Sequence, residues 1–439
     1  MDRQLFGTDG VRGLAGTYPL DNEGCTQIAK AVGINFAKPG ESVVIGHDTR
    51  ESSSQIVQSV IEGLISVGIN VVNIGVIPTP GLAYITKTEE DFSAGIMITA
   101  SHNTYEYNGI KVFANNGDKL SDEEEAKLNT LINSEIPEKE PAKARNDHNL
   151  IKKYEDFLIG TAPNLDLRRY SIAIDSANGA ASGIAEDVFK RLGADVTPIF
   201  DKPNGRNIND NCGATHPEAL ANRVLTNKLS LGIALDGDGD RLIMIDSLGR
   251  EVKGDYILYI LAVVNGLKGV VATSMSNLGF EKALNAHGIE LVRTDVGDRY
   301  VLEALERTGF ELGGEQSGHI IMQNIFNTGD GILSAIHLIK AVQESGRDLA
   351  QWCDEITPFP QALVNVPMED KYVLATPEIK EFIALQSKIL DGNGRIVIRP
   401  SGTEPLARVM VEADNADELA NHIAAQLEEK IKQLGDRQN

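Results

Sequence analysis

The chain has 439 residues, and its 63 acidic against 41 basic side chains give a formal net charge of −22. This balance argues against nucleic acid, whose phosphate backbone is bound by an excess of Lys and Arg. No apolar run approaches the ~20 residues of a membrane span, no signal-peptide pattern is found, and three scattered cysteines form no disulfide framework. We therefore expect a cytoplasmic globular protein that binds neither nucleic acid nor membranes.

Strand–helix–strand units recur three times along the chain. Val- and Ile-rich strands alternate with amphipathic helices at 42–45, 52–67 and 71–74, at 171–175, 180–192 and 195–199, and at 269–273, 278–286 and 290–294. Each unit is followed by a further strand that ends in a polar loop, at 95–99, 232–235 and 310–312. Such alternation predicts mainly parallel α/β sheets, whose ligands bind beyond the carboxyl ends of the strands.

The repeated units predict three related mixed α/β domains with mainly parallel sheets, followed by a smaller C-terminal α+β domain. The polar segment 134–147, which contains two prolines, is a predicted linker, and further boundaries are predicted near 249–254 and 357–360. The last part of the chain contains a predicted strand, 395–398, and a helix from about 416. We assign domains to 1–147, 148–250, 251–357 and 358–439.

The first polar loop contains Ser101 directly before His102. Adjacent residues seldom face each other, so this pair does not by itself predict a Ser–His nucleophile, and Ser101 is alone more typical of a turn. If the loop faced a metal site, a metal ion could activate Ser101 or hold it in phosphorylated form. By themselves, Arg12 in the glycine-rich segment 6–13 and Lys111 after the serine loop are typical of a turn and of a solvated side chain.

The second polar loop places Asp236, Asp238 and Asp240 at alternate positions, separated by glycines. This spacing lets a tight loop direct three carboxylates at one cation. An EF-hand calcium loop is excluded, because its sixth and twelfth positions are Arg241 and Ser247 rather than Gly and Glu. We favour a magnesium site that holds a phosphate oxygen over an acidic turn between two strands.

The third polar loop has Glu315, Ser317 and His319 at alternate positions. In an extended segment these three side chains share one face, an arrangement that suits sugar hydroxyls.

A fourth loop follows the predicted strand 395–398. Its two hydroxyls, its glycine and its flanking arginines form a suitable nest for a phosphate dianion, with an ordinary turn as the alternative. The residues concerned are Arg399, Ser401, Gly402, Thr403 and Arg408.

Together the segments 6–13, 99–103, 236–241, 314–319 and 399–405 resemble, in content and order, the motifs of the α-D-phosphohexomutases. The resemblance extends from about residue 5 to 415. The segment 207–217 and Gln316 resemble the branch of this family that acts on amino-sugar phosphates. Thr104 and Tyr107 depart from the family pattern, in which Pro and Asp are more frequent.

The resemblance implies four domains around a central cleft and a Ser101 that works as a phosphoserine. It implies one Mg²⁺ per chain, held by Ser101, Asp236, Asp238 and Asp240. Glu315 and Ser317 would bind the sugar, and the non-transferred phosphate would be bound by Arg399, Ser401, Gly402, Thr403 and Arg408. The catalytic set would also include Arg12, His102, Lys111, Arg241 and His319, with Lys111 and His319 as the candidates for proton transfer.

The activity implied by the resemblance is the interconversion of glucosamine 6-phosphate and glucosamine 1-phosphate through a bisphosphorylated sugar. Glucose or mannose phosphates are the alternative substrates, and a metal-dependent sugar phosphatase or a non-catalytic sugar-phosphate sensor are the alternative functions. The expected partner is a small sugar phosphate, and the family likeness also implies a homodimer.

Overall fold

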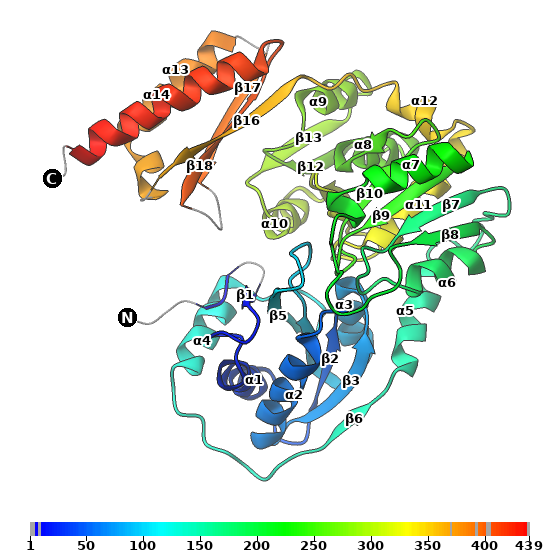
Figure 1. Ribbon diagram of the computed structural model, residues 1–439, viewed down its shortest axis with the longest axis vertical. Coiled ribbons are helices and arrows are strands. Elements are labelled where there is room, and N and C mark those ends of the chain that lie inside the picture. The colour runs from blue at the N-terminus through cyan, green and yellow to red at the C-terminus, as the bar shows by residue number, and fades with distance from the viewer. Residues whose placement is uncertain (1–4, 8–9, 369–370, 391–393, 401–404, 437–439) are drawn as a thin grey trace.

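The computed structural model describes residues 5–7, 10–368, 371–390, 394–400 and 405–436. Within them, four β-sheets follow one another along the chain, and each is the centre of one structural unit. In Figure 1 the first unit lies at the bottom in blue and cyan, the second and third lie at the right and top in green to yellow, and the fourth lies at the upper left in orange and red.

The first unit has a six-stranded sheet in the order β1-β5-β4-β2-β3-β6. Its strands are β1 (Val11–Leu14), β2 (Ser42–His47), β3 (Asn70–Val76), β4 (Phe92–Ile98), β5 (Tyr107–Ala114) and β6 (Ala144–Asn146). Its helices are α1 (Asn22–Phe36), α2 (Ser53–Ser66), α3 (Thr79–Thr88) and α4 (Asp122–Ile132). Helix α5 (Asn149–Gly160) packs against α3 and connects this unit to the next.

The second and third units repeat this plan with fewer strands. The second contains β7 (Ser171–Asp175), α6 (Ile184–Arg191), β8 (Asp195–Ile199), η1 (Gly213–Thr215), α7 (Glu218–Asn227), β9 (Leu231–Leu235), β10 (Leu242–Ile245) and β11 (Glu251–Val252). The third contains α8 (Gly254–Val264), β12 (Gly269–Thr273), α9 (Leu278–Ala286), β13 (Glu290–Thr294), α10 (Asp298–Thr308), β14 (Leu312–Gly314), β15 (Ile320–Met322), α11 (Gly331–Ser345) and α12 (Leu349–Cys353).

The fourth unit is smaller and fully antiparallel, with strand order β16-β18-β17. It consists of β16 (Gln361–Pro367), η2 (Lys371–Ala375), α13 (Pro377–Leu390), β17 (Arg395–Pro400), β18 (Leu406–Glu412) and α14 (Ala416–Asp436). Its buried apolar side chains form a cluster of their own, whereas one large cluster runs through the first three units. The fourth unit is therefore packed as a separate body.

The same four-strand arrangement recurs in the first three sheets, as β5-β4-β2-β3, β10-β9-β7-β8 and β15-β14-β12-β13. In each, the second strand of this order runs parallel to the third and antiparallel to the first. The three polar loops of the sequence are the connections β4–β5, β9–β10 and β14–β15. Three related α/β domains with mainly parallel sheets, followed by a smaller fourth, confirm the predicted fold class.

Several predicted elements differ from the structure at their ends. The helix predicted over 180–192 begins only at Ile184, because the chain turns before it and Gly183 is left-handed with φ 79°. The strand predicted at 310–312 forms two residues later, as β14. The predicted linker 134–147 contributes β6 to the first sheet, and β11 extends the second sheet past residue 250. No helix in the described ranges has both the length and the apolarity to cross a bilayer.

Candidate active site

The serine loop and the aspartate loop meet at the boundary between the first and second units. Ser101 follows β4 and is 1% exposed, and its Oγ donates a hydrogen bond to Asp236 Oδ2 at 2.8 Å. The Nδ1 atom of His102 lies 3.3 Å from the same Oγ. The structure thus brings together a hydroxyl and a carboxylate that are far apart in the sequence.

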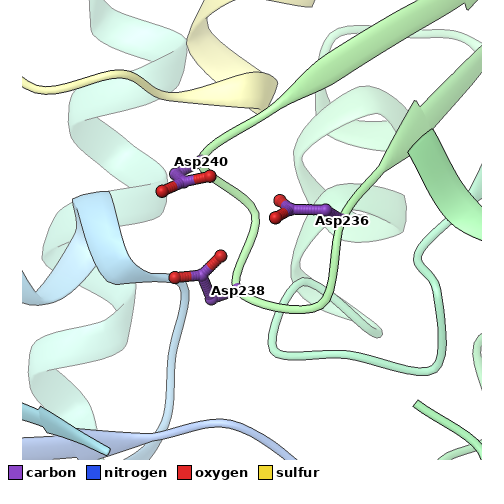
Figure 2. A group of neighbouring side chains, drawn as sticks. All are labelled: Asp236, Asp238 and Asp240. Atoms are coloured by element: carbon purple, nitrogen blue, oxygen red, sulfur yellow. The ribbon is translucent and has the colours of Figure 1, made fainter. Parts of the chain in front are cut away.

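The three carboxylates of the β9–β10 loop converge on one space. Figure 2 shows Asp236, Asp238 and Asp240 directed toward one another from a single turn of chain. All three are buried, and one ligand oxygen of each lies within 4.8 Å of the others. Burial and the charges of Asp240 and Asp238 raise the pKa of Asp236 well above its usual value. A cation placed among the three would relieve this repulsion.

Lys111 and His319 approach the aspartate loop from two other domains. Lys111, on β5, is 3% exposed, and its Nζ lies 2.7 Å from Asp238 Oδ2 and 3.6 Å from Asp240 Oδ2. Burial acts to lower the pKa of Lys111, but the two carboxylates together raise it above its ordinary value, so the side chain is a cation. His319 Nδ1 lies 3.7 Å from Asp240 Oδ2, and its Nε2 lies 3.6 Å from Asp298 Oδ2.

The carboxylate oxygens of the aspartate loop are suitable ligands for a hard divalent cation. Asp238 Oδ1 and Asp240 Oδ1 are buried and accept no hydrogen bond from the described residues. Buried carboxylate oxygens without a partner are costly unless something else satisfies them. A magnesium ion takes such oxygen ligands, and three carboxylates beside the Ser101 hydroxyl leave positions open for a phosphate oxygen. The residues present therefore suit the ion that the sequence predicts.

Arg12, Arg241 and His102 border the serine and aspartate loops. Arg12 lies on β1, opposite Gly109 of β5. Arg241 donates its backbone N–H to Asp236 Oδ1 at 3.2 Å, and its Nε lies 3.9 Å from Asp240 Oδ1. Burial, aided by the charges of Arg241 and Arg12, lowers the pKa of His102 to about 4. His102 is therefore neutral near pH 7 in the protein as described.

A central cavity of about 630 Å³ is lined by residues from all four units. The first unit contributes His102 and the second Arg241, while Glu315 and Ser317 come from the third. The cavity also has Thr215, Lys253, Met275, Gln316, Arg399 and Arg408 in its wall. A cleft shared by all four domains is thus present, as the resemblance implies.

The expectation that Glu315, Ser317 and His319 share one face is wrong. The segment is a turn and not an extended strand, closed by a hydrogen bond from Gly318 N to Glu315 O at 2.9 Å, and Gly318 has φ 96°. Glu315 and Ser317 consequently line the central cavity, with Ser317 Oγ 3.5 Å from Glu315 Oε2. His319 is instead directed at Asp240.

The fourth unit places two arginines at the cavity. Arg399 on β17 and Arg408 on β18 are paired across the sheet, so their side chains emerge side by side. Burial, followed by the charge of Arg408, lowers the pKa of Arg399. Two adjacent cations in a cleft are suited to a dianionic phosphate. Ser401, Gly402 and Thr403, the other predicted phosphate ligands, lie outside the described residues.

Some residues at the site were missed by the sequence reasoning. Thr79, at the start of α3, donates to Asp238 Oδ2 at 2.6 Å. Asp48 and Arg50 follow β2 at the same sheet edge as Ser101, and Arg50 reaches the carbonyl of Ser101. Asn209 reaches that carbonyl from the second unit. The position of Asp48 and Arg50 just after a predicted strand was a usable signal, whereas Asn209 lay in a segment noted only for its family likeness.

Comparisons with known proteins match all four units. Family models for the phosphoglucomutase/phosphomannomutase alpha/beta/alpha domains I, II and III match residues 3–139, 152–249 and 253–359. The model for the C-terminal domain of that family matches residues 363–430.

Similar proteins cover almost the whole chain. It is 44% identical over 435 residues to a phosphoglucosamine mutase of Thermus thermophilus, with 98% of each chain covered. Its fold is similar to that of a phosphoglucomutase/phosphomannomutase family protein from Burkholderia thailandensis, with a TM-score of 0.81, 22% identity and 95% of each chain covered. It is also similar to the fold of N-acetylphosphoglucosamine mutase from Aspergillus fumigatus, solved in complex with GlcNAc-6P and magnesium, with a TM-score of 0.68 and 19% identity over 97% of this chain and 95% of that one.

Proposed function

The chain belongs to the phosphoglucomutase/phosphomannomutase family, and we propose that it interconverts glucosamine 6-phosphate and glucosamine 1-phosphate through a phosphorylated Ser101. As a phosphohexomutase it is an isomerase. The observation that carries the proposal is the hydrogen bond between Ser101 Oγ and Asp236 Oδ2, beside a cavity lined from all four units. The amino-sugar substrate is supported by the 44% identity to the Thermus phosphoglucosamine mutase.

The reaction consists of two phosphoryl transfers in opposite directions. In the first, the bond between Ser101 Oγ and phosphorus breaks as the phosphoryl group passes to the free hydroxyl of the sugar monophosphate. The sugar hydroxyl loses its proton and Ser101 Oγ gains one, so the product is a bisphosphorylated sugar with a free serine hydroxyl. In the second, the other phosphate of the sugar returns its phosphoryl group to Ser101 Oγ, which loses its proton, and the sugar oxygen gains one. The net result is an isomer, with the phosphoserine regenerated.

Between the two transfers the bisphosphorylated sugar must reverse its orientation. One phosphate is then held at Arg399 and Arg408 while the other faces Ser101, and afterwards the two exchange places. Glu315 and Ser317, which line the cavity between these ends, are proposed to bind the sugar hydroxyls in both orientations. Ser401, Gly402 and Thr403 complete the proposed phosphate site. The separately packed fourth unit could close over the ligand and exclude water, which would otherwise hydrolyse the phosphoserine.

We propose that Ser101, Asp236, Asp238 and Asp240 hold one Mg²⁺ per chain. When bound, this ion supplies positive charge that stabilises the phosphoryl group in transfer. Lys111 adds positive charge from β5, and Arg12 and Arg241 border the same loops. The support for this assignment is the pair of buried Oδ1 atoms on Asp238 and Asp240, neither of which accepts a hydrogen bond from the described residues.

Proton transfer is assigned to Lys111 and His319, as the family likeness implies. Both are buried, and both lie within 4 Å of Asp240, Lys111 at 3.6 Å and His319 at 3.7 Å. His102 is assigned to the orientation of Ser101, because its Nδ1 lies 3.3 Å from the serine Oγ. We further propose a cytoplasmic location, which suits three buried cysteines that are all free thiols. The homodimer stays a prediction.

The experiment that tests the function is a side-by-side assay on three hexose 6-phosphates, those of glucosamine, glucose and mannose. The purified protein is given Mg²⁺ and a trace of the corresponding hexose 1,6-bisphosphate, and the anomeric phosphate is followed by phosphorus NMR. We expect glucosamine 1-phosphate to form fastest, without release of inorganic phosphate. Inorganic phosphate without isomer would indicate a phosphatase. Faster conversion of glucose or mannose phosphate would overturn the proposed substrate, and no conversion of any would favour a sensor.

A further inference from the structure

Ser101 is held in a backbone conformation that a serine does not adopt freely. Its φ is 50°, in the left-handed region that non-glycine residues occupy rarely and at an energetic cost. Its N–H donates to Thr99 Oγ1 at 3.0 Å, and its Oγ donates to Asp236. Such a conformation persists only where the surroundings hold it, so the groups that bind its carbonyl oxygen help to hold the backbone from which the hydroxyl projects.

Arg50 binds that carbonyl from within the first unit. The Arg50 side chain is fully buried, and its Nε pairs with Asp48 Oδ2 at 2.7 Å. Its Nη2 donates to the carbonyl oxygens of Ser101 and Asn103, each at 2.9 Å. Its Nη1 donates to the carbonyl oxygens of Thr104 and Tyr107. The guanidinium therefore makes five hydrogen bonds, and the four that go to the serine loop are all accepted by backbone carbonyl oxygens.

Asn209 binds the same two carbonyls from the second unit. Its Nδ2 donates to Ser101 O at 2.8 Å and to Asn103 O at 2.9 Å, and the residue is 5% exposed. Its Oδ1 accepts no hydrogen bond from the described residues, so the two carbonyls are the partners that this side chain has there. Arg50 is anchored to the same sheet as the serine loop, whereas Asn209 is anchored to the unit that carries the aspartates.

The aspartate loop also contacts Asn209. A Cβ atom placed on Gly237, between Asp236 and Asp238, would lie 2.5 Å from Asn209 Nδ2 and 2.6 Å from Ser101 O. The amide of Asn209 is therefore in contact with both the serine loop and the aspartate loop. Its backbone is fixed in turn, because its N–H donates to Ala177 O at 3.0 Å, just after β7.

We propose that Asn209 is a positioning residue that sets the Ser101 hydroxyl against the aspartate loop across the boundary between the first two units. Resting on the proposed function, this inference adds to it a residue whose side-chain hydrogen bonds go to backbone carbonyls of the serine loop. One amide donates to the carbonyl oxygens of Ser101 and Asn103 and so holds the strained serine loop, with Arg50 as the anchor on the other side. Loss of that amide displaces Ser101 Oγ relative to Asp236 without changing the cavity wall, of which Asn209 is no part.

The test compares Asn209→Gly with the matched control Asn211→Gly. Both asparagines are left-handed, with φ of 56° and 51°, so glycine removes each side chain without adding backbone strain. Asn211 is exposed, and its side chain donates to Asp210 rather than to the serine loop. We expect Asn209→Gly to lower kcat by on the order of 10–100-fold, the cost of a misplaced reacting group, with KM unchanged within about twofold. Asn211→Gly should have the same kcat and KM as the wild type.

A second variant, Asn209→Asp, keeps the shape but replaces the donor amide by a carboxylate that faces two carbonyl oxygens. We expect it to lower kcat further than glycine does. Equal kcat values for Asn209→Gly and Asn211→Gly would overturn the proposal, and so would a raised KM with unchanged kcat, which is the signature of a substrate contact.

A turnover-independent readout separates this inference from the proposed function. The rate at which a hexose 1,6-bisphosphate phosphorylates Ser101 is followed by intact mass in the wild type and in each variant, and Asn209→Gly should slow it by a similar factor. If the wild type is phosphorylated at Ser101 but converts no glucosamine 6-phosphate, the proposed function fails and these rates alone decide the role of Asn209. If the wild type is not phosphorylated there, both proposals fail.

Discussion

Ser101→Ala is expected to abolish turnover while leaving substrate binding intact. Without the hydroxyl no phosphoryl group can be carried between the two ends of the sugar, and loss of a covalent catalytic group costs on the order of 10⁴-fold or more in kcat. Binding should persist, because Ser101 is 1% exposed while the cavity wall is formed by other residues. The measurements are kcat by the phosphorus NMR assay and the Kd of glucosamine 6-phosphate by calorimetry.

Two further variants make this result specific to the hydroxyl. Ser101→Gly relieves the strain of a φ of 50° yet also lacks the hydroxyl, so it should be as inactive as the alanine variant. Ser182→Ala, at a serine whose Oγ has no hydrogen-bond partner among the described residues, should retain full activity. Substantial turnover by Ser101→Gly would show that phosphoryl transfer uses another group.

The second large effect is expected from the aspartate loop. Asp238→Asn removes one of three converging carboxylate charges and weakens the contact with Lys111 Nζ, which is 2.7 Å away. Loss of a metal's charge stabilisation amounts to several kcal/mol, so we expect kcat to fall on the order of 10³-fold. Chelation of divalent ions should lower the kcat of the wild type as strongly. Added Mg²⁺ should then restore the activity of the wild type but not that of the variant.

Asp246→Asn is the matched control for this variant. Asp246 is also a buried aspartate of the second unit, but it follows β10 directly, pairs with Arg250 at 2.7 Å and does not line the cavity. We expect Asp246→Asn to unfold at lower temperature while it keeps its response to Mg²⁺. If Asp238→Asn responded to chelation and Mg²⁺ like the wild type, the metal assignment would be wrong.

Much of the fold could be predicted because its signals are local in the sequence. The third unit shows this best: β12, α9 and β13 have the predicted bounds, since short Val- and Ile-rich runs and helical periodicity depend only on neighbouring residues. The convergence of the three aspartates was predictable for the same reason, because alternate positions in a glycine-rich loop reach one point. The resemblance to the phosphohexomutase motifs predicted that Ser101 lies beside these aspartates, and the structure brings the two loops together.

What the sequence could not provide are the contacts that depend on tertiary packing. His319 was expected beside Glu315 and Ser317, but Gly318 bends the chain and directs the imidazole to Asp240. By itself, the sequence around Lys111 is typical of a solvated surface lysine, whereas in the structure Lys111 is buried and pairs with Asp238. Asn209 lies far from Ser101 along the chain, and no spacing rule connects an asparagine side chain to two carbonyl oxygens of another domain.

The central claim is that Ser101 carries the phosphoryl group during turnover. The most direct test is phosphopeptide mapping of the wild-type protein after incubation with Mg²⁺ and a hexose 1,6-bisphosphate. We predict a single phosphate on the peptide that contains Ser101, and an isotopic label carried in that phosphate should pass to the sugar when glucosamine 6-phosphate is added. An active protein that carries phosphate on a different residue, or on none, would contradict the account.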